Sequence, residues 1–454
     1  MQLNTSFLKV HKTPLLLAIS SFLFYGAFAY DLQRTDYIKL LSLYTALFFL
    51  FYKLIQLTKH NLKLLTWIAF GFRTIFILAI PNLSQDFYRF IWDGQMLFIG
   101  VNPYLSTPDY HMTLGILSEF PNQVALYEGM GSLSASHYTN YPPLNQILFF
   151  LANLFPGKSI LSSVIGLRLI IITADLGTLF FGKKLLEKLK LPAHNIFWYI
   201  LNPFIIIELT GNLHFEGVMI FFLVWSLYLL YSNKWKLAAI VFVCSVSIKL
   251  IPLIFLPLLY QKLGWKKSIG FYTIVGIVTL LLFAPFYSSR FLSNYTETVG
   301  LWFQNFEFNA SLYYVAREIG YLFRGFNEIA IIGKYIALLV FLFVVGMSFF
   351  RKNKSMIQFI TAMLFALSFY YFTATTVHPW YVATLLILSI FTKYKFPLVW
   401  SFVIILSYLA YLQIGKADKT ENLWIIALEY LVVYGFFIWE LFFKRKSHSF
   451  LNSN

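Results

Sequence analysis

The sequence predicts an all-α polytopic membrane protein, a single integral-membrane domain of residues 1–454 with about 13 to 14 transmembrane helices. The first observation behind this prediction is composition. Hydrophobic residues make up 59% of the chain, charged residues only 12%, and the mean hydropathy is +0.70. Soluble domains do not have this composition. The second observation is that apolar runs, separated by short polar turns, recur along almost the whole chain.

The apolar runs give the expected membrane spans in chain order. We place them at 13–30, 38–57, 64–81, 161–182, 195–211, 213–231, 236–248, 251–260, 268–286, 329–350, 356–375, 379–392, 396–412 and 423–443. The first run is long enough to span and lacks a small-residue cleavage site, so we expect no cleavable signal peptide. The single cysteine, Cys244, lies in an apolar run and argues against a disulfide framework or a thiolate metal site.

Charged residues are distributed unevenly between the loops on the two sides of these spans. Lysine and arginine gather in alternate loops, for example at 183–190 and 351–354, whereas most acidic residues lie in the other loops. This positive-inside pattern predicts that both termini are cytoplasmic, including the basic tail at 444–454. The net charge of +16 is therefore a topology signal and does not indicate nucleic-acid binding. A composition rich in Lys, Asn, Ile and Phe favours a bacterial inner membrane, with the outer side facing the periplasm.

Two apolar stretches leave the topology open. Residues 143–156 are short for a span, and counting them as one would place the 183–190 cluster outside. We therefore expect a helix lying on the outer membrane surface. Residues 236–260 form either one long span or a hairpin. Pro252 favours a break, which moves Lys249 from the middle of the membrane to the outer face.

Two long outer loops interrupt the spans, at residues 82–160 and 287–328. Loops of this length in a compact protein are usually functional. The first loop begins with an acidic and aromatic stretch, Ser84–Gly94, and we expect it to be the catalytic loop. The second loop is aromatic and polar, and it contains an expected amphipathic helix near 310–323.

The acidic stretch supplies the first candidates for chemistry. Asp86, Arg89 and Asp93 are spaced i, i+3 and i+7, which places them on one helical face. Carboxylates at the mouth of a membrane core are costly to desolvate, so a function is expected there. Ser84 is the expected helix cap. The alternative is that Asp86 only stabilises a helix start and that Arg89 and Asp93 form a surface ion pair.

Short turns and a lysine bring further polar groups to the same outer face. They are Asn212, His214 and Glu216 in one turn, His378 and Trp380 in another, and Lys249 at the expected break. Each has a simpler interpretation, as a solvated turn, an interfacial aromatic residue or a lysine extending to the interface. The two histidines have no HxxxH spacing, which gives no support for a metal site.

These segments, in this order, resemble the GT-C class of integral-membrane glycosyltransferases. Tyr141–Leu144 is similar to the YPPL segment of the lumenal glucosyltransferases that build N-glycan precursors. Gly211–Phe215 is similar to their GHGHF turn, and Ile248–Lys249 to their FK pair. Asp86–Gly94 and Gly100–Tyr104 are more similar to bacterial mannosyltransferases of the class. The chain departs from the pattern by having an asparagine in the turn and by lacking a DxD pair.

The resemblance implies a GT-C-like fold and an inverting glycosyltransferase that moves a hexose, with mannose preferred. The donor would be a polyprenyl-phosphate sugar, the acceptor a lipid-linked or cell-envelope glycan on the non-cytoplasmic face, and no cofactor or metal would be needed. Asp86 would be the catalytic base. The donor phosphate would be bound by Lys249, with Arg89, Arg317 and His378 as helpers. The sugar or acceptor would be contacted by Asp93, Tyr141, Asn212, His214, Glu216 and Trp380.

Two other functions fit part of the pattern. A lipid-linked glycan flippase or transporter also needs many spans, but it predicts charges spread through the membrane, and the chain has few of these. They are Arg73, Arg168, Asp175 and Glu208. The absence of an internal repeat also counts against common transporter folds. A glycan polymerase or ligase that uses a diphosphate lipid is a closer relative and stays open.

Overall fold

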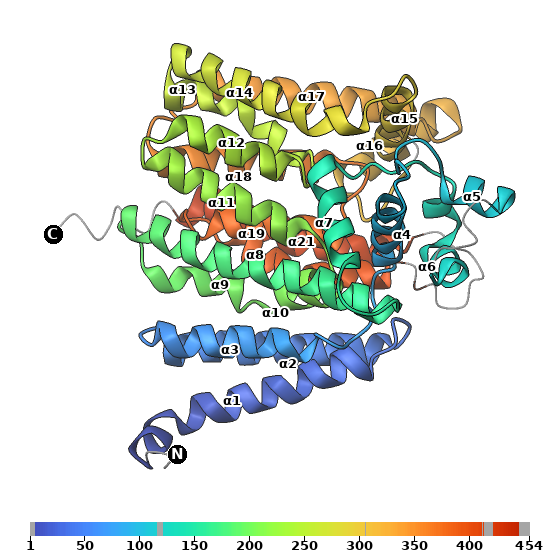
Figure 1. The fold of residues 1–454 in the computed structure, drawn as a ribbon. Helices are drawn as coiled ribbons and strands as arrows, with labels where there is room; N and C mark the ends of the chain where they lie inside the picture. Colours follow the sequence, from blue (N-terminus) through green and yellow to red (C-terminus); the bar gives the residue numbers. More distant parts are fainter. Residues whose placement is uncertain (1–4, 116–120, 305, 411, 413–420, 445–454) are drawn as a thin grey trace.

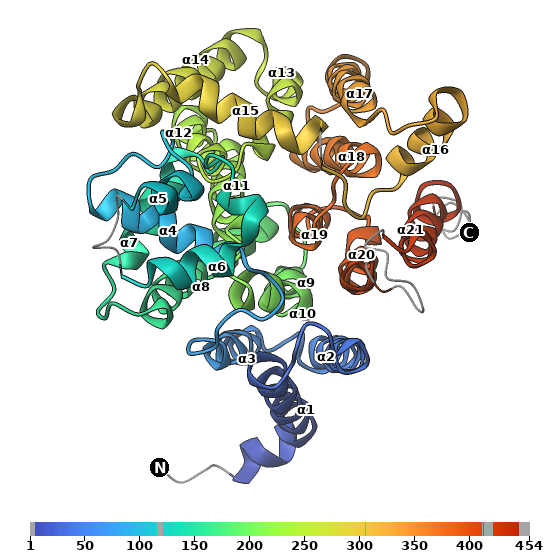
Figure 2. The same cartoon turned by 90° about the vertical axis from the view of Figure 1, so that its right-hand side faces the viewer.

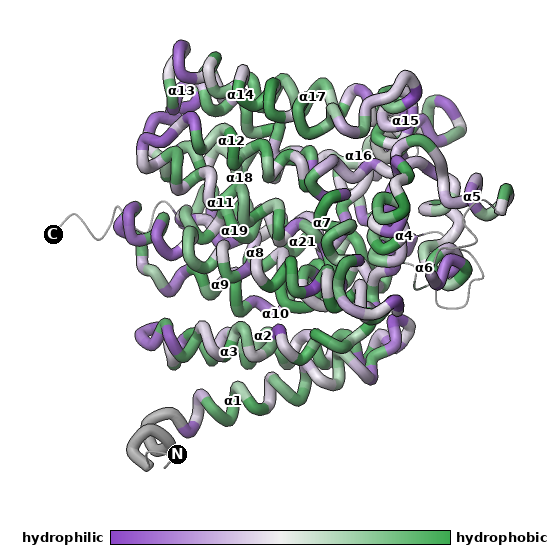
Figure 3. The backbone as a smooth tube through the Cα atoms, viewed as in Figure 1, coloured by the Kyte–Doolittle hydropathy of each residue, from purple (hydrophilic) through white to green (hydrophobic). Residues whose placement is uncertain are grey.

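The computed structural model describes residues 5–115, 121–304, 306–410, 412 and 421–444. Over these residues the chain is helical apart from turns and loops, and the one β-pairing described is an isolated bridge between Phe308 and Thr376. Most helices run side by side as a bundle (Figure 1), and Figure 2 looks along them. Hydrophilic residues concentrate at the two ends of the bundle, with hydrophobic residues between them (Figure 3). The all-α polytopic membrane fold is therefore confirmed.

Within the described ranges, seven helices are long and apolar enough to cross a membrane on their own. They are α1 (Thr5–Tyr30), α2 (Tyr37–Thr58), α8 (Ile160–Lys188), α14 (Trp265–Phe283), α17 (Ile329–Phe350), α18 (Met356–Thr373) and α21 (Leu423–Ile438). Short helical extensions follow two of them, η4 (Ala284–Phe286) and η7 (Trp439–Phe443). Each of the seven overlaps one of the expected spans.

The remaining expected spans fall on shorter or broken elements of the same bundle. These are α3 (Leu62–Ile75), η1 (Ala193–Ile196), α9 (Phe197–Ile200), α10 (Pro203–Ile205), η2 (Ile206–Gly211), α11 (Glu216–Tyr231), α12 (Trp235–Val246), η3 (Ile251–Leu258), α13 (Leu259–Leu263), η5 (Pro379–Tyr381), α19 (Val382–Ser389), α20 (Phe396–Val403) and η6 (Ile404–Leu409). The chain bends by 115° between Pro203–Gly211 and Glu216–Tyr231. Length and composition thus support seven spans, or eight if the bent pair is one span. The 13 to 14 spans expected from the sequence stay a prediction.

The two long loops form helices of their own, which gather at one end of the bundle (Figure 1). The first loop holds α4 (Asp86–Phe98), α5 (Pro108–Leu114), α6 (Gln123–Ala135) and α7 (Pro143–Asn153), and the second holds α15 (Phe291–Gln304) and α16 (Leu312–Arg324). We call this end of the bundle the loop end. α4 and α7 run across the bundle helices rather than along them (Figure 1). The short apolar stretch near 143 is therefore a crosswise helix, and α16 is the helix expected near 310–323.

The ambiguous stretch 236–260 is broken, as the proline and the lysine distribution suggested. α12 ends at Val246 and η3 begins at Ile251, so Lys249 lies in the connection between them. The tail at 445–454 lies outside the described residues.

The buried arginines and Asp175 of the bundle have partners inside it. Arg73 and Asp175 form a fully buried ion pair, with Nε 2.8 Å from Oδ2. Arg168 donates to the carbonyls of Thr210 and Gly211 at 2.9 and 3.0 Å. Buried charges are tolerated when they are paired or hydrogen-bonded in this way. Arg168 also fixes the end of η2, from which the turn with His214 and Glu216 begins.

Candidate active site at the loop end

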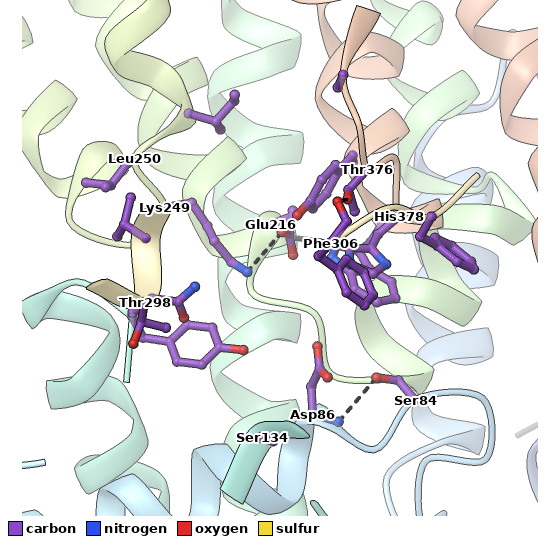
Figure 4. Close-up of a pocket in the computed structure, with 18 of the residues that line it drawn as sticks. Ser84, Asp86, Ser134, Glu216, Lys249, Leu250, Thr298, Phe306, Thr376 and His378 are labelled. Carbon is purple, nitrogen blue, oxygen red and sulfur yellow. Dashed lines mark hydrogen bonds and ion pairs between the residues drawn. The ribbon is translucent and has the colours of Figure 1, made fainter. Parts of the chain in front are cut away.

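A cavity of about 500 Å³ opens where the loop helices meet the bundle. Seven of the predicted site residues line it: Asp86, Arg89, Tyr141, Glu216, Lys249, His378 and Trp380. They come from elements far apart in the sequence, and Figure 4 shows several of them around the same space. The fold therefore brings together the acidic stretch, the lysine and the histidine turn.

Asp86 is the first residue of α4, and its side chain points into the cavity (Figure 4). Ser84 Oγ accepts a hydrogen bond from the Asp86 backbone N–H at 3.3 Å, while Gln85 occupies the cap position. The Asp86 side chain is 36% exposed, through the cavity. Burial raises the pKa of Asp86 to about 6; Lys249 opposes the shift and Glu216 adds to it. A pKa close to neutral suits a general base.

Lys249 is held at the cavity wall by two neighbours. Its Nζ atom is 3.2 Å from Glu216 Oε1 (Figure 4) and 5.1 Å from the centre of the Tyr141 ring. Glu216 begins α11 and Tyr141 precedes α7, so three separate segments meet at this ammonium group. The arrangement places a cation, 24% exposed, on the cavity surface.

Three aromatic rings, those of His214, Trp380 and His378, stack on one another next to Asp86. The Trp380 indole lies between the two imidazoles, with ring centres 3.6 Å from His214 and 4.6 Å from His378. Burial lowers the pKa of His378 to about 3, and it also holds the pKa of His214 well below its ordinary value, with Lys249 adding to both effects. Both imidazoles are therefore neutral at physiological pH. His378 can offer a donor phosphate one hydrogen bond rather than a positive charge.

Arg89 and Asp93 form a buried ion pair, not the surface pair that the spacing alone would allow. Arg89 Nε is 2.7 Å from Asp93 Oδ1, and the arginine also donates to the His137 carbonyl at 3.0 Å. Asp93 Oδ2 accepts from Gln146 Nε2 at 3.0 Å and is fully buried. These bonds join α4, the segment after α6, and α7. The contacts favour a supporting role for the pair over direct contact with a sugar or phosphate.

Three further candidates are not among the residues that line the cavity: Asn212, His214 and Arg317. Asn212 Oδ1 accepts from the Leu83 backbone N–H at 3.3 Å, which ties the turn to the segment before Asp86. His214 is 1% exposed and lies beneath Trp380. Arg317 Nη1 is 2.7 Å from Glu307 and Nη2 is 2.9 Å from Glu318. Because none of the three lines the cavity, their contacts with substrate stay a prediction.

The structure adds lining residues that sequence reasoning missed. Arg34, from the loop between α1 and α2, lies 5.9 Å from the centre of the Tyr408 ring, and both residues line the cavity. Phe306 and Phe308, from the second loop, stack against His378 with ring centres 6.0 and 5.2 Å away. No motif marks these positions. Their only signal is the positive-inside pattern, which places Arg34 and the second loop on the same side as Asp86.

Comparison with known families gives a match over residues 25–263. The matching family model is described as alpha-(1->6)-mannopyranosyltransferase, N-terminal domain. The matched region is more than half of the 454 residues and includes Asp86, Glu216 and Lys249. A comparison with curated proteins found no match.

Proposed function

Because the chain belongs to the alpha-(1->6)-mannopyranosyltransferase family and is a membrane glycosyltransferase, we propose that it takes mannose from a polyprenyl-phosphate donor. The acceptor would be a lipid-linked or cell-envelope glycan, and transfer would invert the anomeric carbon on the non-cytoplasmic face. The observation that carries this proposal is the shared cavity. A carboxyl group with a raised pKa, at the start of α4, and a cation in the connection between α12 and η3 both face it.

The chemistry divides between these two groups. Asp86 takes the proton of the acceptor hydroxyl as the acceptor oxygen forms a bond to C1 of mannose. The bond from C1 to the phosphate oxygen breaks, and its electron pair leaves with the lipid phosphate. Lys249 stabilises the charge that develops there. A phosphate is a good leaving group, so no second protonated acid is required.

The walls of the cavity fit the remaining parts of such a donor. One side is apolar, with Leu250 and Ile251 at the start of η3 and Gly333 and Ile336 on α17. Leu250 and Ile251 directly follow Lys249, and α17 contacts η3, so a lipid tail could extend along η3 and α17 while its phosphate meets the ammonium group. Trp380 also lines the cavity, and because its faces stack on His214 and His378, a sugar ring would meet the edge of the indole.

Donor specificity is the first test of this proposal. The purified protein in lipid nanodiscs would receive radiolabelled polyprenyl-phosphate-mannose, a membrane lipid extract as acceptor, and a chelator. We expect mannose transfer that Asp86→Asn abolishes and that Asp109→Asn, outside the cavity, leaves unchanged. Transfer only from glucose- or arabinose-charged donors would overturn the choice of sugar. No transfer from any donor, together with lipid translocation, would favour a flippase.

A further inference from the structure

Glu208 is a buried carboxyl group that the mechanism above leaves without a role. It lies in the π-helical segment η2, is 1% exposed, and is not one of the cavity-lining residues. Its two oxygens accept from the Tyr408 hydroxyl at 2.8 and 3.0 Å. Acidic groups at membrane depth are costly to bury, and π-helical turns occur frequently at functional sites. Both facts call for a function at this position.

His214 lies between this carboxyl group and the catalytic one. Its Nε2 atom is 3.9 Å from Glu208 Oε2, and its Nδ1 atom is 4.0 Å from Asp86 Oδ2. Nε2 is buried and has no hydrogen-bond partner among the described residues. Stacking on Trp380 fixes the plane of the ring. Each ring nitrogen therefore faces a different carboxyl group.

We propose that Glu208 is a positioning residue of the transferase site: it accepts the Nε2 proton of His214 and keeps Nδ1 free to face Asp86. The proposal rests on the function proposed above. The acceptor proton first moves to Asp86 as the C1–phosphate bond breaks. In the step that limits turnover it then passes to Nδ1 while the Nε2 proton passes to Glu208, so Asp86 is again a carboxylate. When the products leave, Glu208 returns its proton to Nε2 as Nδ1 gives its proton to water that enters beside Asp86, which restores the starting form of His214. The Tyr408 hydroxyl donates to Glu208 and holds the carboxyl group in place.

The paired movement of two protons has a physical reason. Burial disfavours a charged imidazole at this position, so a step that left His214 protonated on both nitrogens would be costly. Passing one proton on while receiving another keeps the ring neutral. The two separations exceed a hydrogen bond by about 1 Å, and catalytic hydrogen bonds commonly tighten when substrate binds.

Kinetics separates this role from a purely structural one. We expect Glu208→Gln to lower kcat on the order of 10²-fold, with KM changed less than about twofold, and Glu208→Asp to recover part of the loss. When the wild-type rate is plotted against the deuterium fraction of H2O–D2O mixtures, we expect a curved plot, which indicates that two protons move in the rate-limiting step. Glu208→Gln should give a straight line. The control is Glu440→Gln, another buried carboxyl group that is not among the cavity-lining residues.

A second measurement needs no donor and so separates this proposal from the proposed function. In 15N-histidine-labelled protein, the His214 signal is assigned by its loss in His214→Gln. We expect the neutral Nε2-protonated form in the wild type and a loss of that preference in Glu208→Gln. A wild-type Nδ1-protonated form, or an unchanged isotope curve and kcat in Glu208→Gln, would overturn the proposal. The expected tautomer without mannose transfer would overturn the proposed function alone.

Discussion

Asp86 combines access to the cavity with a largely buried environment. Its side chain is 36% exposed, and burial raises the pKa of its carboxyl group to about 6. The pKa of an ordinary exposed aspartate is lower by about two units, so it would be a weaker base. The position at the first turn of α4 sets the direction of the side chain, and the turn that carries His214 closes the opposite side.

The pH dependence of transfer follows from this pKa. A general base works only when deprotonated, so kcat/KM should be constant above pH 7 and should fall as the pH drops through about 6. The measurement is the initial rate at low donor concentration between pH 4.5 and 8. A lower limb centred near 4 would contradict the raised pKa of Asp86.

Lys249 should contribute mainly to the bond-breaking step. Lys249→Gln removes the cation that faces the leaving phosphate, and we expect kcat to fall about 10²- to 10³-fold. Lys249→Arg should retain more activity because it keeps the charge. Lys158→Gln changes a lysine of the first loop that does not line the cavity, and it should behave as wild type. Equal activity of Lys249→Gln and Lys158→Gln would show that Lys249 has no part in leaving-group stabilisation.

Individual residues were predictable from the sequence to different degrees. Asp86, Glu216 and Lys249 could be placed at one face because helix spacing and loop charge depend on local sequence. The burial of His214 and of the Arg89–Asp93 pair could not be predicted, because it depends on which helices pack over these residues. Tyr408 was missed for the same reason, since it lies 200 positions from its partner Glu208.

At the level of elements, paired charges hold the membrane helices in register around the site. The Arg73–Asp175 pair joins α3 to α8, and Arg73 also donates to the Ile200 carbonyl at 2.8 Å. Arg168 binds the end of η2 in a similar way. Arg168 therefore supports the turn that carries His214 and Glu216, while the Arg73–Asp175 pair joins the helices beside it.

Breaking one partner of the buried pair should be more damaging than replacing both. Arg73→Met leaves Asp175 buried without its cation, and we expect a loss of about 3 to 5 kcal/mol in stability. Arg73→Met combined with Asp175→Leu should recover most of that loss. Thermal unfolding in detergent micelles measures both variants. A single variant as stable as wild type would show that the pair is not a structural support.

The break near Lys249 was correctly inferred from proline and from keeping lysine clusters on one side of the membrane. The same reasoning predicted a surface helix near Pro143; α7 is a helix there, and its position at the membrane surface stays a prediction. Lengths of the shorter apolar helices were less predictable. Several expected spans are split into α-helical and 3-10 segments, such as α20 and η6, and hydropathy does not distinguish the two helix types.

On the scale of the whole molecule, the two ends of the bundle differ in structure. The loop end carries α4–α7, α15, α16 and the cavity, whereas the other end is formed by short turns (Figure 1). The positive-inside pattern assigns the loop end to the non-cytoplasmic side. Such an orientation would present Asp86 to acceptors outside the cytoplasm.

Cysteine labelling tests the orientation. In a Cys244→Ser background, cysteines would be placed at Glu128 on α6 and at Lys352 after α17, both exposed. We expect a membrane-impermeant maleimide to label position 128 in intact cells and position 352 only after permeabilisation. The reverse pattern would place the active site in the cytoplasm and contradict the proposed side of the reaction.

The central claim is that Asp86 is the base for mannose transfer from a lipid phosphate bound at Lys249. Its most direct test is single-turnover transfer and donor binding, measured on the same nanodisc samples of wild type and Asp86→Asn. We expect Asp86→Asn to bind the donor with unchanged affinity and to transfer mannose at a rate lowered on the order of 10²- to 10⁴-fold. A near-normal rate in Asp86→Asn, with the donor bound, would contradict it.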